Sequence, residues 1–273
     1  MSHNEIAKFM DLKLQDKTAF VSGSTAGIGF ATAKRLLQEG VVVIINGRTQ
    51  LTVDTAVEDL KTQVPGARVS GIAADFSKVE DVDRLIDALP GIDILINNAG
   101  IFEPKPFDEI PDADWFRFFE INVMSGVRMS RALFPKMIAR NWGRIIFISS
   151  ESAIMVPSEM IHYGMTKSAQ LSISTGLAQL TKGTGVTVNS VLPGPTMSKG
   201  VGGFLEDLAK ANSVTVENVE KDFFTNNRPG SLINRFATVE EIADIIAYFA
   251  SPLASATNGA AIRAEGGLVK SIV

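Results

Sequence analysis

The sequence predicts a doubly wound α/β fold, in which a parallel sheet of seven strands is covered by helices on both faces. The main observation is a series of short apolar runs, rich in Val and Ile and separated by segments of helical length. Strands that are apolar almost throughout are expected where helices cover both faces of a parallel sheet. Their alternation with helices along the chain favours right-handed crossovers within one sheet. Six clear runs and a weaker seventh span residues 18–21, 41–45, 68–72, 92–96, 144–148, 186–192 and 260–264.

Signals for helix ends lie between these runs. The helical segment 30–38 leads to Gly40, which suits the left-handed residue that follows many helices. Thr238 and Glu241 have the spacing of a capping box. Behind this box lies an apolar face that consists of Ile242, Ile245, Ile246 and Phe249. No linker or charge block divides the chain, so we expect a single domain over residues 1–273.

Composition and charge argue against several classes of function. The chain has 273 residues, is 45% hydrophobic, and carries a net charge of −4 with no dense basic stretch, so a nucleic-acid partner is not expected. No apolar run approaches the roughly 18 residues that cross a bilayer, and residues 1–17 lack the apolar core of a secretory signal. We therefore expect a cytoplasmic protein without a membrane partner. With no cysteine and no histidine cluster, no metal site is expected.

A glycine-rich loop follows the first predicted strand and opens the first predicted helix. It reads Gly23-Ser24-Thr25-Ala26-Gly27-Ile28-Gly29. Glycines permit a tight turn and a close approach of the backbone to a pyrophosphate, and the free N–H groups of a helix N-terminus attract that anion. The position of the loop between strand and helix predicts a dinucleotide site.

A second group of residues predicts proton chemistry. Tyr163 and Lys167 are four residues apart in a helix expected over 161–182, so their side chains share one face. The pKa of a free tyrosine is about 10, and a nearby ammonium is expected to bring it toward the working range. Ser150 ends the fifth predicted strand, where its hydroxyl can bind a substrate oxygen, and Ser149 is the rival candidate.

Taken in order, these motifs resemble those of the short-chain dehydrogenase/reductase family. The Gly-x3-Gly-x-Gly loop, the segment Asn97-Asn98-Ala99-Gly100 and the Tyr-x3-Lys pair match that family's signatures from about residue 17 onward. The resemblance implies a Rossmann fold, and its serine-to-tyrosine spacing selects Ser150 over Ser149. It also implies that Asn122, in an otherwise amphipathic helix, orders a water in a proton relay. The catalytic residues that it implies are Asn122, Ser150, Tyr163 and Lys167.

The resemblance also implies a set of cofactor contacts. Relatives that use NAD usually have Asp at the position of Gly47, and the guanidinium of Arg48 suits a 2′-phosphate, so NADP(H) is favoured. Ala26 replaces a basic residue of NADP-dependent relatives, which leaves NAD(H) open. Asp75 matches an adenine contact but equally suits a helix cap. The expected cofactor-binding residues are Gly23, Thr25, Gly27, Ile28, Gly29, Arg48, Asp75, Asn98, Tyr163, Lys167, Pro193, Gly194, Thr196 and Ser198, with Ser198 or Thr196 beside the nicotinamide.

The reaction that the resemblance implies is hydride transfer between NAD(P)(H) and a small molecule, interconverting a carbonyl and a secondary alcohol with Tyr163 as acid and base. Three alternatives stay open: a 3-oxoacyl-thioester reductase of the same family, an epimerase or dehydratase that holds its cofactor tightly, and a nucleotide-binding relative without catalysis. Substrate walls are expected from residues 151–162 and 196–229. The second segment carries helical signals, including Thr215 as an N-cap. These predict either a structured substrate lid or two helices packed on the sheet edge. His162 is expected at the substrate wall or on the surface.

Small residues on the helix of Tyr163 predict a homo-oligomer. They are Gly164, Ser168, Ala169, Ser172 and Gly176. Such residues let a second helix approach closely, and relatives are commonly dimers or tetramers that use this helix, so we expect a homodimer or a homotetramer. The alternative is that these residues pack only against the chain's own sheet.

Overall fold

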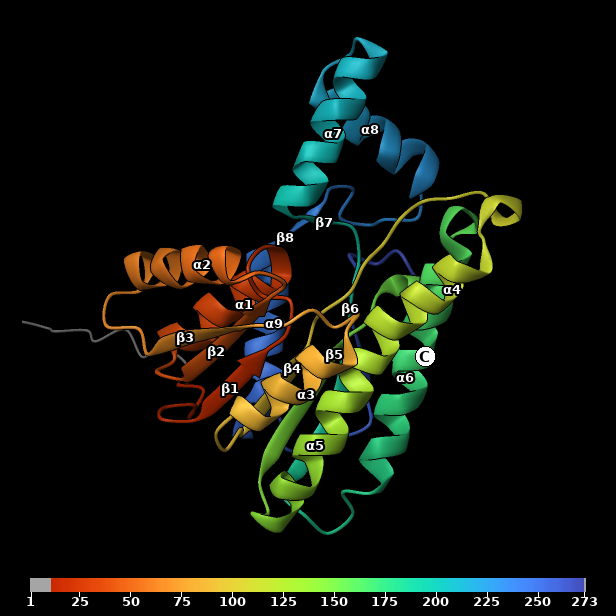
Figure 1. The fold of residues 1–273 in the computed structure, drawn as a ribbon. Coiled ribbons are helices and arrows are strands. Elements are labelled where there is room, and N and C mark those ends of the chain that lie inside the picture. Colours follow the sequence, from red (N-terminus) through yellow and green to blue (C-terminus); the bar gives the residue numbers. More distant parts are fainter. Residues whose placement is uncertain (1–10, 273) are drawn as a thin grey trace, which may run out of the picture.

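A seven-stranded parallel sheet forms the centre of the molecule (Figure 1). The computed structural model describes residues 11–272. The strand order is β3-β2-β1-β4-β5-β6-β9, and every neighbouring pair is parallel. All seven predicted strands are confirmed, with ends that differ by at most two residues. They are β1 (Thr18–Val21), β2 (Val42–Gly47), β3 (Val69–Ala73), β4 (Ile94–Asn97), β5 (Gly143–Ile148), β6 (Val186–Pro193) and β9 (Ala261–Ala264).

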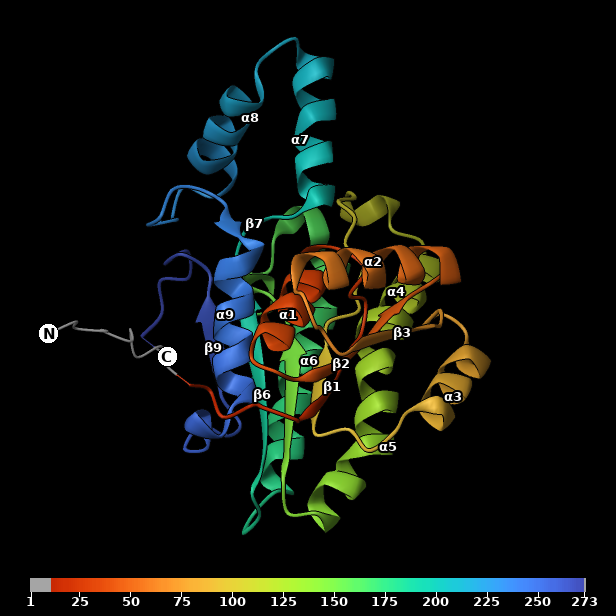
Figure 2. The same cartoon turned by 90° about the vertical axis from the view of Figure 1, so that its left-hand side faces the viewer.

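Helices cover both faces of the sheet (Figures 1 and 2). One face carries α1 (Gly27–Gln38), α2 (Gln50–Gln63) and α9 (Val239–Ala250). The other face carries α3 (Val79–Ala88), α5 (Ser125–Ala139) and α6 (Ile161–Gln179), and α4 (Asp112–Phe119) runs through the π-helix η2 (Glu120–Met124) into α5. The short 3₁₀ turns are η1 (Phe107–Glu109), η3 (Glu151–Ala153), η4 (Ser158–Met160) and η6 (Pro252–Ala254). Within residues 11–272, no helix is both long and apolar enough to cross a membrane.

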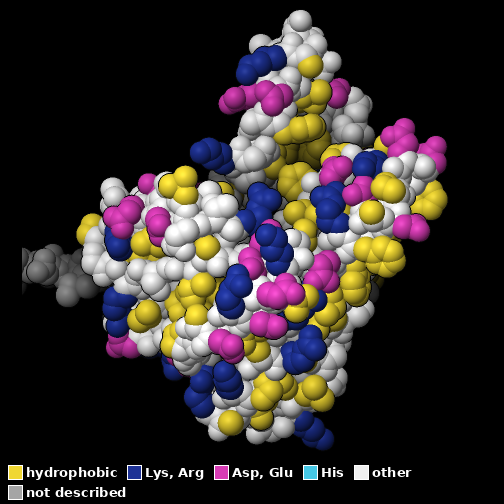
Figure 3. Space-filling model, in the orientation of Figure 1, with side chains coloured by type: hydrophobic (Ala, Val, Ile, Leu, Met, Phe, Trp, Pro, Cys, Tyr) yellow, Lys and Arg dark blue, Asp and Glu magenta, His cyan; other side chains and the backbone are white. Residues whose placement is uncertain are grey.

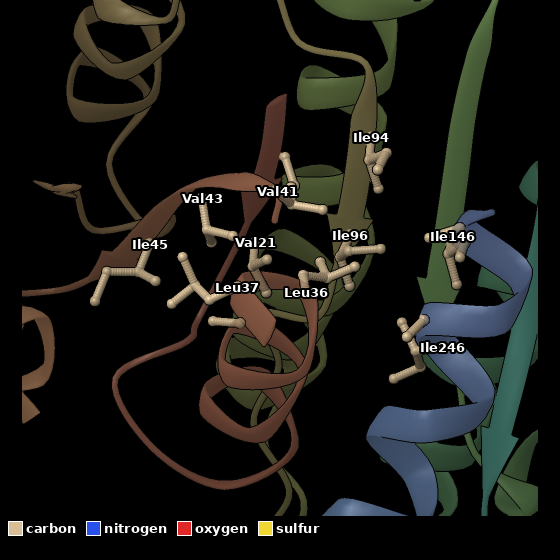
Figure 4. Close-up of a cluster of buried hydrophobic side chains, with 14 of the residues drawn as sticks. Val21, Leu36, Leu37, Val41, Val43, Ile45, Ile94, Ile96, Ile146 and Ile246 are labelled. Atoms are coloured by element: carbon tan, nitrogen blue, oxygen red, sulfur yellow. The ribbon is translucent and has the colours of Figure 1, made fainter. Parts of the chain in front are cut away.

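The core beneath α1 and α9 shows why the strands are apolar throughout (Figure 4). Val21 and Ile96 point from the sheet into this core, which Ile246 of α9 completes. The residues just before them in β1 and β4, Phe20 and Leu95, are buried in the second core on the opposite face. Alternate side chains of one strand therefore enter two different cores, as expected for a sheet covered on both faces.

The N-terminus of α9 is closed by the predicted capping box. The Thr238 hydroxyl accepts a hydrogen bond from the Glu241 backbone N–H at 3.1 Å. In return, the Thr238 N–H donates to the Glu241 carboxylate at 2.8 Å. The Arg235 guanidinium and this capping hydrogen bond together hold the pKa of Glu241 at about 2. The local sequence pattern thus sets the start of this helix.

Residues 199–236 form a separate layer beyond the carboxyl ends of the strands, here called the cap. Figures 1 and 2 show its helices standing above the sheet and not against its edge. The cap has its own small core around Leu205, Val219 and Phe224, so its helices pack mainly on one another. Thr215 caps its helix as predicted, accepting from the Asn218 N–H at 3.2 Å. The cap elements are α7 (Lys199–Asn212), α8 (Val216–Asp222) and the π-helix η5 (Phe223–Asn227), framed by the paired strands β7 (Thr196–Met197) and β8 (Ala237–Thr238).

Candidate active site

A cavity of about 630 Å³ lies between the carboxyl edge of the sheet and the cap. Its walls come from the loops after β1, β4, β5 and β6, from α6 and from the cap, and Figure 3 shows hydrophobic side chains gathered in the hollow beneath the cap. This edge is where open α/β sheets bind ligands. The predicted residues that line the cavity are Gly23, Gly27, Ile28, Asn98, Ser150, Tyr163, Lys167, Pro193, Gly194, Thr196 and Ser198. Thr25, Gly29, Arg48, Asp75 and Asn122 are not part of its lining.

Close packing explains the glycines of the loop after β1. A Cβ atom on Gly23 would lie 2.9 Å from the Ala99 backbone, and one on Gly29 would lie 2.5 Å from the Asn98 side chain. Gly23 and Gly27 both have a φ of +59°, a conformation that other residues rarely adopt. Since α1 begins at Gly27, the free N–H groups of its first turn open at the cavity. The loop therefore forms a cradle in which backbone can approach an anion closely.

Asn98 braces this cradle from the neighbouring strand. Its Nδ2 donates to the carbonyl oxygens of Ser22 at 3.0 Å and Gly23 at 2.8 Å. The Ser22 hydroxyl in turn accepts from the N–H groups of Asn98 and Ala99, both at 2.9 Å. The segment after β4 thus holds the glycine loop in place, which gives it a structural role beyond ending a strand.

The end of β2 lies beyond the cavity. A Cβ atom on Gly47 would lie 2.5 Å from Cγ2 of Thr25, so glycine is favoured here by packing as well as by any choice of cofactor. Arg48 follows it and is exposed. Packing is therefore a second physical reason for the glycine at position 47, which the sequence analysis connected with NADP.

Asp75 forms a turn after β3 and does not cap the next helix. Its carboxylate accepts from the backbone N–H of Ser77 at 3.0 Å and from the Ser77 hydroxyl at 2.8 Å. The residue that precedes α3 is Lys78. Although burial acts to raise it, the pKa of Asp75 is held below its usual value by the hydrogen bonds from Ser77 and the charges of Lys78 and Arg48.

Tyr163 and Lys167 share one face of α6, as the spacing predicts, and both line the cavity. The Lys167 ammonium donates to the Ile148 carbonyl oxygen at 2.8 Å and lies 5.6 Å from the centre of the Tyr163 ring. Burial lowers the pKa of Lys167 to about 8, against the opposing charge of Glu151. Burial and the charge of Glu151 raise the pKa of Tyr163, and the interaction of its phenol with the Ser150 hydroxyl opposes them. The expected lowering of the tyrosine pKa is thus wrong, because burial and the charge of Glu151 raise it.

The two serines at the end of β5 have different partners. The Ser149 hydroxyl donates to the Lys167 carbonyl oxygen at 2.9 Å, so it ties β5 to α6. The Ser150 hydroxyl interacts with Tyr163, accepts from the Ser152 N–H at 3.1 Å and donates to the Glu151 carboxylate at 2.5 Å. The structure therefore places Ser150, and not Ser149, beside the phenol.

Asn122 lies in the π-helix η2, where the sequence analysis expects a regular helix. Its Oδ1 accepts from the Ile101 N–H at 2.7 Å, while its Nδ2 donates to the Ile101 carbonyl oxygen and the Thr166 hydroxyl, both at 3.0 Å. Its backbone carbonyl oxygen accepts from Gln170 at 2.6 Å. The side chain is fully buried and binds the cavity wall from behind. Asn122 thus connects the Ile101 backbone to α6, and π-turns of this kind are frequent at functional sites.

The turn after β6 brings its residues to the cavity beside the glycine loop. A Cβ atom on Gly194 would lie 2.7 Å from Cα of Glu265, so only glycine fits there. The Thr196 hydroxyl donates to the Gly194 carbonyl oxygen at 2.8 Å. The Ser198 hydroxyl accepts from the Val201 N–H at 3.3 Å and so caps α7. Ser198 also lies across from Gly27, since a Cβ atom on that glycine would be 3.5 Å from the serine Cβ.

A buried charged pair next to Ser150 was not singled out from the sequence. Glu151 and Arg228 are only 6% and 8% exposed, and Oε1 of Glu151 lies 3.8 Å from Nε of Arg228. The arginine also binds Glu159 at 3.3 Å, and all three side chains line the cavity. Burial raises the pKa of Glu151, opposed by the hydrogen bond from Ser150 and the charge of Arg228. The sequence offered one signal for this pair, because Glu151 is an acidic residue directly after an apolar strand and Ser150. Its partner, Arg228, is 77 positions away in the chain.

His162 is neither a substrate wall nor a surface residue, which corrects the expectation. It is fully buried on the far side of α6, 4.1 Å from the Phe118 ring and 6.0 Å from the Trp115 ring between centroids. One residue along a helix turns a side chain by about 100°, so His162 faces α4 while Tyr163 faces the cavity. Burial lowers the pKa of His162, and both its ring nitrogens lack a partner among the described residues.

The small residues of α6 divide between two faces. Gly164 packs against the chain's own loop, since a Cβ atom there would lie 2.6 Å from Val156. The Ser168 hydroxyl donates to the Ala153 carbonyl oxygen at 2.7 Å. Ser172 and Gly176, by contrast, are exposed. Gly164 and Ser168 therefore pack within the chain, as the alternative to an oligomer interface predicts, whereas Ser172 and Gly176 do not.

Comparison with known proteins finds relatives over nearly the whole chain. The family model described as short chain dehydrogenase matches residues 17–208. The uncharacterized oxidoreductase YvaG of Bacillus subtilis (strain 168) is 51% identical over 96% of this chain and 100% of its own length. The D-beta-hydroxybutyrate dehydrogenase of Cupriavidus necator is 31% identical over 94% of this chain and 99% of its own.

A solved structure shares the fold over nearly the whole chain. The L-sorbose reductase from Gluconobacter frateurii, crystallised with NADPH and L-sorbose, superposes with a TM-score of 0.90 at 30% identity. The match covers 96% of this chain and 100% of that one.

Proposed function

The chain belongs to the short chain dehydrogenase family, and on that premise we propose that Ser150, Tyr163 and Lys167 carry its chemistry, with Asn122 as a positioning residue. The chain is an NAD(P)-dependent oxidoreductase that interconverts a carbonyl and a secondary alcohol. The observation that carries the proposal is that the phenol, the serine hydroxyl and the ammonium line one cavity together with the glycine loop.

The residues of the loop suit a dinucleotide. A Cβ atom on Gly23 or Gly29 would occupy the space where the backbone packs, and the N-terminus of α1 presents free N–H groups at the same place. We assign the pyrophosphate to this cradle and the nicotinamide to the turn of Pro193 and Gly194, with Ser198 beside it. When bound, the nicotinamide supplies or accepts the hydride at the reacting carbon.

The protein's own groups handle the proton. Since its pKa is raised, Tyr163 holds its proton at neutral pH and can donate it to the oxygen of a carbonyl that is being reduced. Ser150 binds the same oxygen through its hydroxyl, and the positive charge of Lys167 stabilises the phenolate that the transfer leaves behind. Asn122 acts through the Ile101 backbone and Thr166, which it holds against this wall.

Replacing Tyr163 by Phe tests the assignment. The change removes only the hydroxyl, so kcat should fall by on the order of 10²–10⁴-fold while the dissociation constant for NADPH changes little. Tyr248→Phe is the matched control, because the chain has only these two tyrosines and Tyr248 lies half-exposed on α9. Retention of more than about a tenth of kcat in Tyr163→Phe would contradict the role of the phenol.

A preference for NADP(H) over NAD(H) is the finer part of the cofactor proposal. It is supported by the exposed guanidinium of Arg48 at the end of β2, near Asp75. A charge-assisted bond to a 2′-phosphate contributes roughly 1.5–3 kcal/mol, or about ten- to a hundredfold in affinity. Titration of both cofactors should show this preference in the wild type and in Arg131→Ala, an exposed control, but not in Arg48→Ala. Equal affinities in the wild type would show that Arg48 does not select the cofactor.

We propose two further features of the whole molecule. The helices within residues 196–229 act as a lid on the substrate, a role supported by Val201, Phe204 and Leu208 of α7 in the cavity wall. The chain assembles as a homodimer or homotetramer, supported by the exposed small residues Ser172 and Gly176 on α6. In a twofold interface the same helix of each subunit would meet its copy.

A further inference from the structure

A charged corner of the cavity lies directly beside Ser150. The corner consists of Glu151, Glu159 and Arg228, and the cap supplies the arginine. The Glu151 carboxylate is hydrogen-bonded to the Ser150 hydroxyl at 2.5 Å and lies 3.8 Å from the guanidinium of Arg228. Most of the remaining cap wall is apolar, with Phe204, Leu208 and other hydrophobic side chains. A buried charge is costly unless it is paired, and Nε of Arg228 has no hydrogen-bond partner among residues 11–272, so the bonding of this corner is incomplete.

The position of the corner identifies which part of a substrate would meet it. In the proposed function, which this inference extends, the Ser150 hydroxyl binds the oxygen of the reacting carbonyl. Because a hydroxyl has one hydrogen, Ser150 must turn it from the Glu151 carboxylate to that carbonyl oxygen, which leaves the carboxylate as an open acceptor 2.5 Å from the serine oxygen. The substrate atoms nearest to it are therefore substituents on the carbon adjacent to the carbonyl.

Charge decides the chemistry of that substituent. A carboxylate would face two carboxylates, Glu151 and Glu159, with one guanidinium between them. An ammonium would meet the same two carboxylates, but it would also face two cations, Arg228 and the buried Lys167. An apolar group would form no hydrogen bond with these charged side chains. Nε of Arg228 lacks a hydrogen-bond partner among residues 11–272, and an apolar group would not supply one.

A hydroxyl is the small group that both donates and accepts. Its hydrogen would go to the Glu151 carboxylate, and its oxygen would face the guanidinium of Arg228, which lies beside that carboxylate. We infer that the substrate is an α-hydroxyketone, or in the reverse direction a vicinal diol, and that Glu151 recognises the hydroxyl next to the reacting carbon. The hydrocarbon remainder of the substrate lies against the apolar wall of the cap.

A matched pair of ketones tests this inference. The kcat/KM of the wild type is measured with 1-hydroxy-2-butanone and with 2-butanone, using NADPH and then NADH. A hydrogen bond to a charged acceptor is expected to favour the hydroxyketone by about ten- to a hundredfold. In Glu151→Leu this preference should disappear. Glu217→Leu, an exposed glutamate on α8, is the matched control and should keep it.

Glu151→Gln keeps the shape of the side chain and is measured beside Glu151→Leu. Because a neutral acceptor forms a weaker bond, the isosteric variant should lose about tenfold of the preference. A wild type without preference, or an equal loss with both ketones in the Glu151 variants, would overturn the inference. The second result would mean that Glu151 acts only by orienting Ser150. Failure of the proposed function looks different, because then neither the wild type nor the Glu217 control would oxidise a nicotinamide cofactor with either ketone, and the inference would fall with it.

Discussion

Replacing Asn122 by Ala tests whether a residue outside the cavity positions the catalytic wall. The amide makes three hydrogen bonds, two to the Ile101 backbone and one to the Thr166 hydroxyl. Alanine would leave the N–H and C=O groups of Ile101 without these partners. A buried polar group that loses its partner costs about 1–3 kcal/mol. Because Ile101 is only partly buried, we expect a total loss of about 2–4 kcal/mol in the free energy of unfolding, or roughly 3–7 °C in Tm.

Activity should fall as well, for a geometric reason. A Cβ atom on Gly100 would lie 3.4 Å from Oδ1 of Asn122 and 3.5 Å from Nζ of Lys167, so the amide and the ammonium meet at this wall. Thr166, which accepts from the amide, also donates to the Tyr163 carbonyl oxygen at 2.7 Å. A misplacement of about 1 Å at a reacting group can cost on the order of 10²-fold in rate. We therefore expect kcat/KM at 25 °C to fall by about this factor.

The matched control is Asn189→Ala. Asn189 is equally buried and bonds two backbone groups, the Thr257 carbonyl oxygen at 2.9 Å and the Ala260 N–H at 3.0 Å, but it lies outside the cavity. This variant should lose a similar amount of stability and keep its activity. Urea denaturation and steady-state rates are measured on both variants well below their Tm. If Asn122→Ala stays within about threefold of wild-type kcat/KM, the positioning role is refuted and Asn122 only stabilises the fold.

Three further predictions concern other groups. Burial lowers the pKa of Lys167 to about 8, so its ammonium is lost as the pH rises through that value. The kcat/KM for the cofactor reports the free enzyme and should fall over the same range, whereas a flat profile between about pH 7 and 9 would contradict this. His162→Phe should raise the free energy of unfolding by about 1–3 kcal/mol, since it removes two buried unpaired nitrogens. As the pKa of His162 is lowered on folding, only the unfolded chain is protonated just below about pH 6.5, so the gain in urea denaturation should grow toward acid; an equal or lower stability would show that the nitrogens are satisfied. Ser172→Arg should dissociate the proposed oligomer and lower activity, and light scattering that reports a 29.3 kDa wild-type monomer at micromolar concentration would exclude that oligomer.

The order of strands and helices, the glycine loop and the Tyr-x3-Lys pair were all predictable from the sequence. Each depends on local chemistry: strands apolar on both faces, glycines before a helix, and a four-residue spacing that puts two side chains on one helical face. The capping box of Thr238 and Glu241 is equally local, and the structure confirms it. Such features need no knowledge of what lies across the fold, so the sequence by itself determined the fold class and the outline of the site.

What only the tertiary structure decided depends on partners far apart in the chain. Glu151 meets Arg228 because the cap folds back over the loop after β5. Asn122 lies in a π-turn, which the residue pattern does not predict, and there it binds the Ile101 backbone. His162 is buried because α4 packs against the face of α6 opposite the cavity. Burial also reversed the expected direction of the Tyr163 pKa, since the cost of desolvating a charge depends on everything that surrounds it and not on the neighbour that a motif supplies.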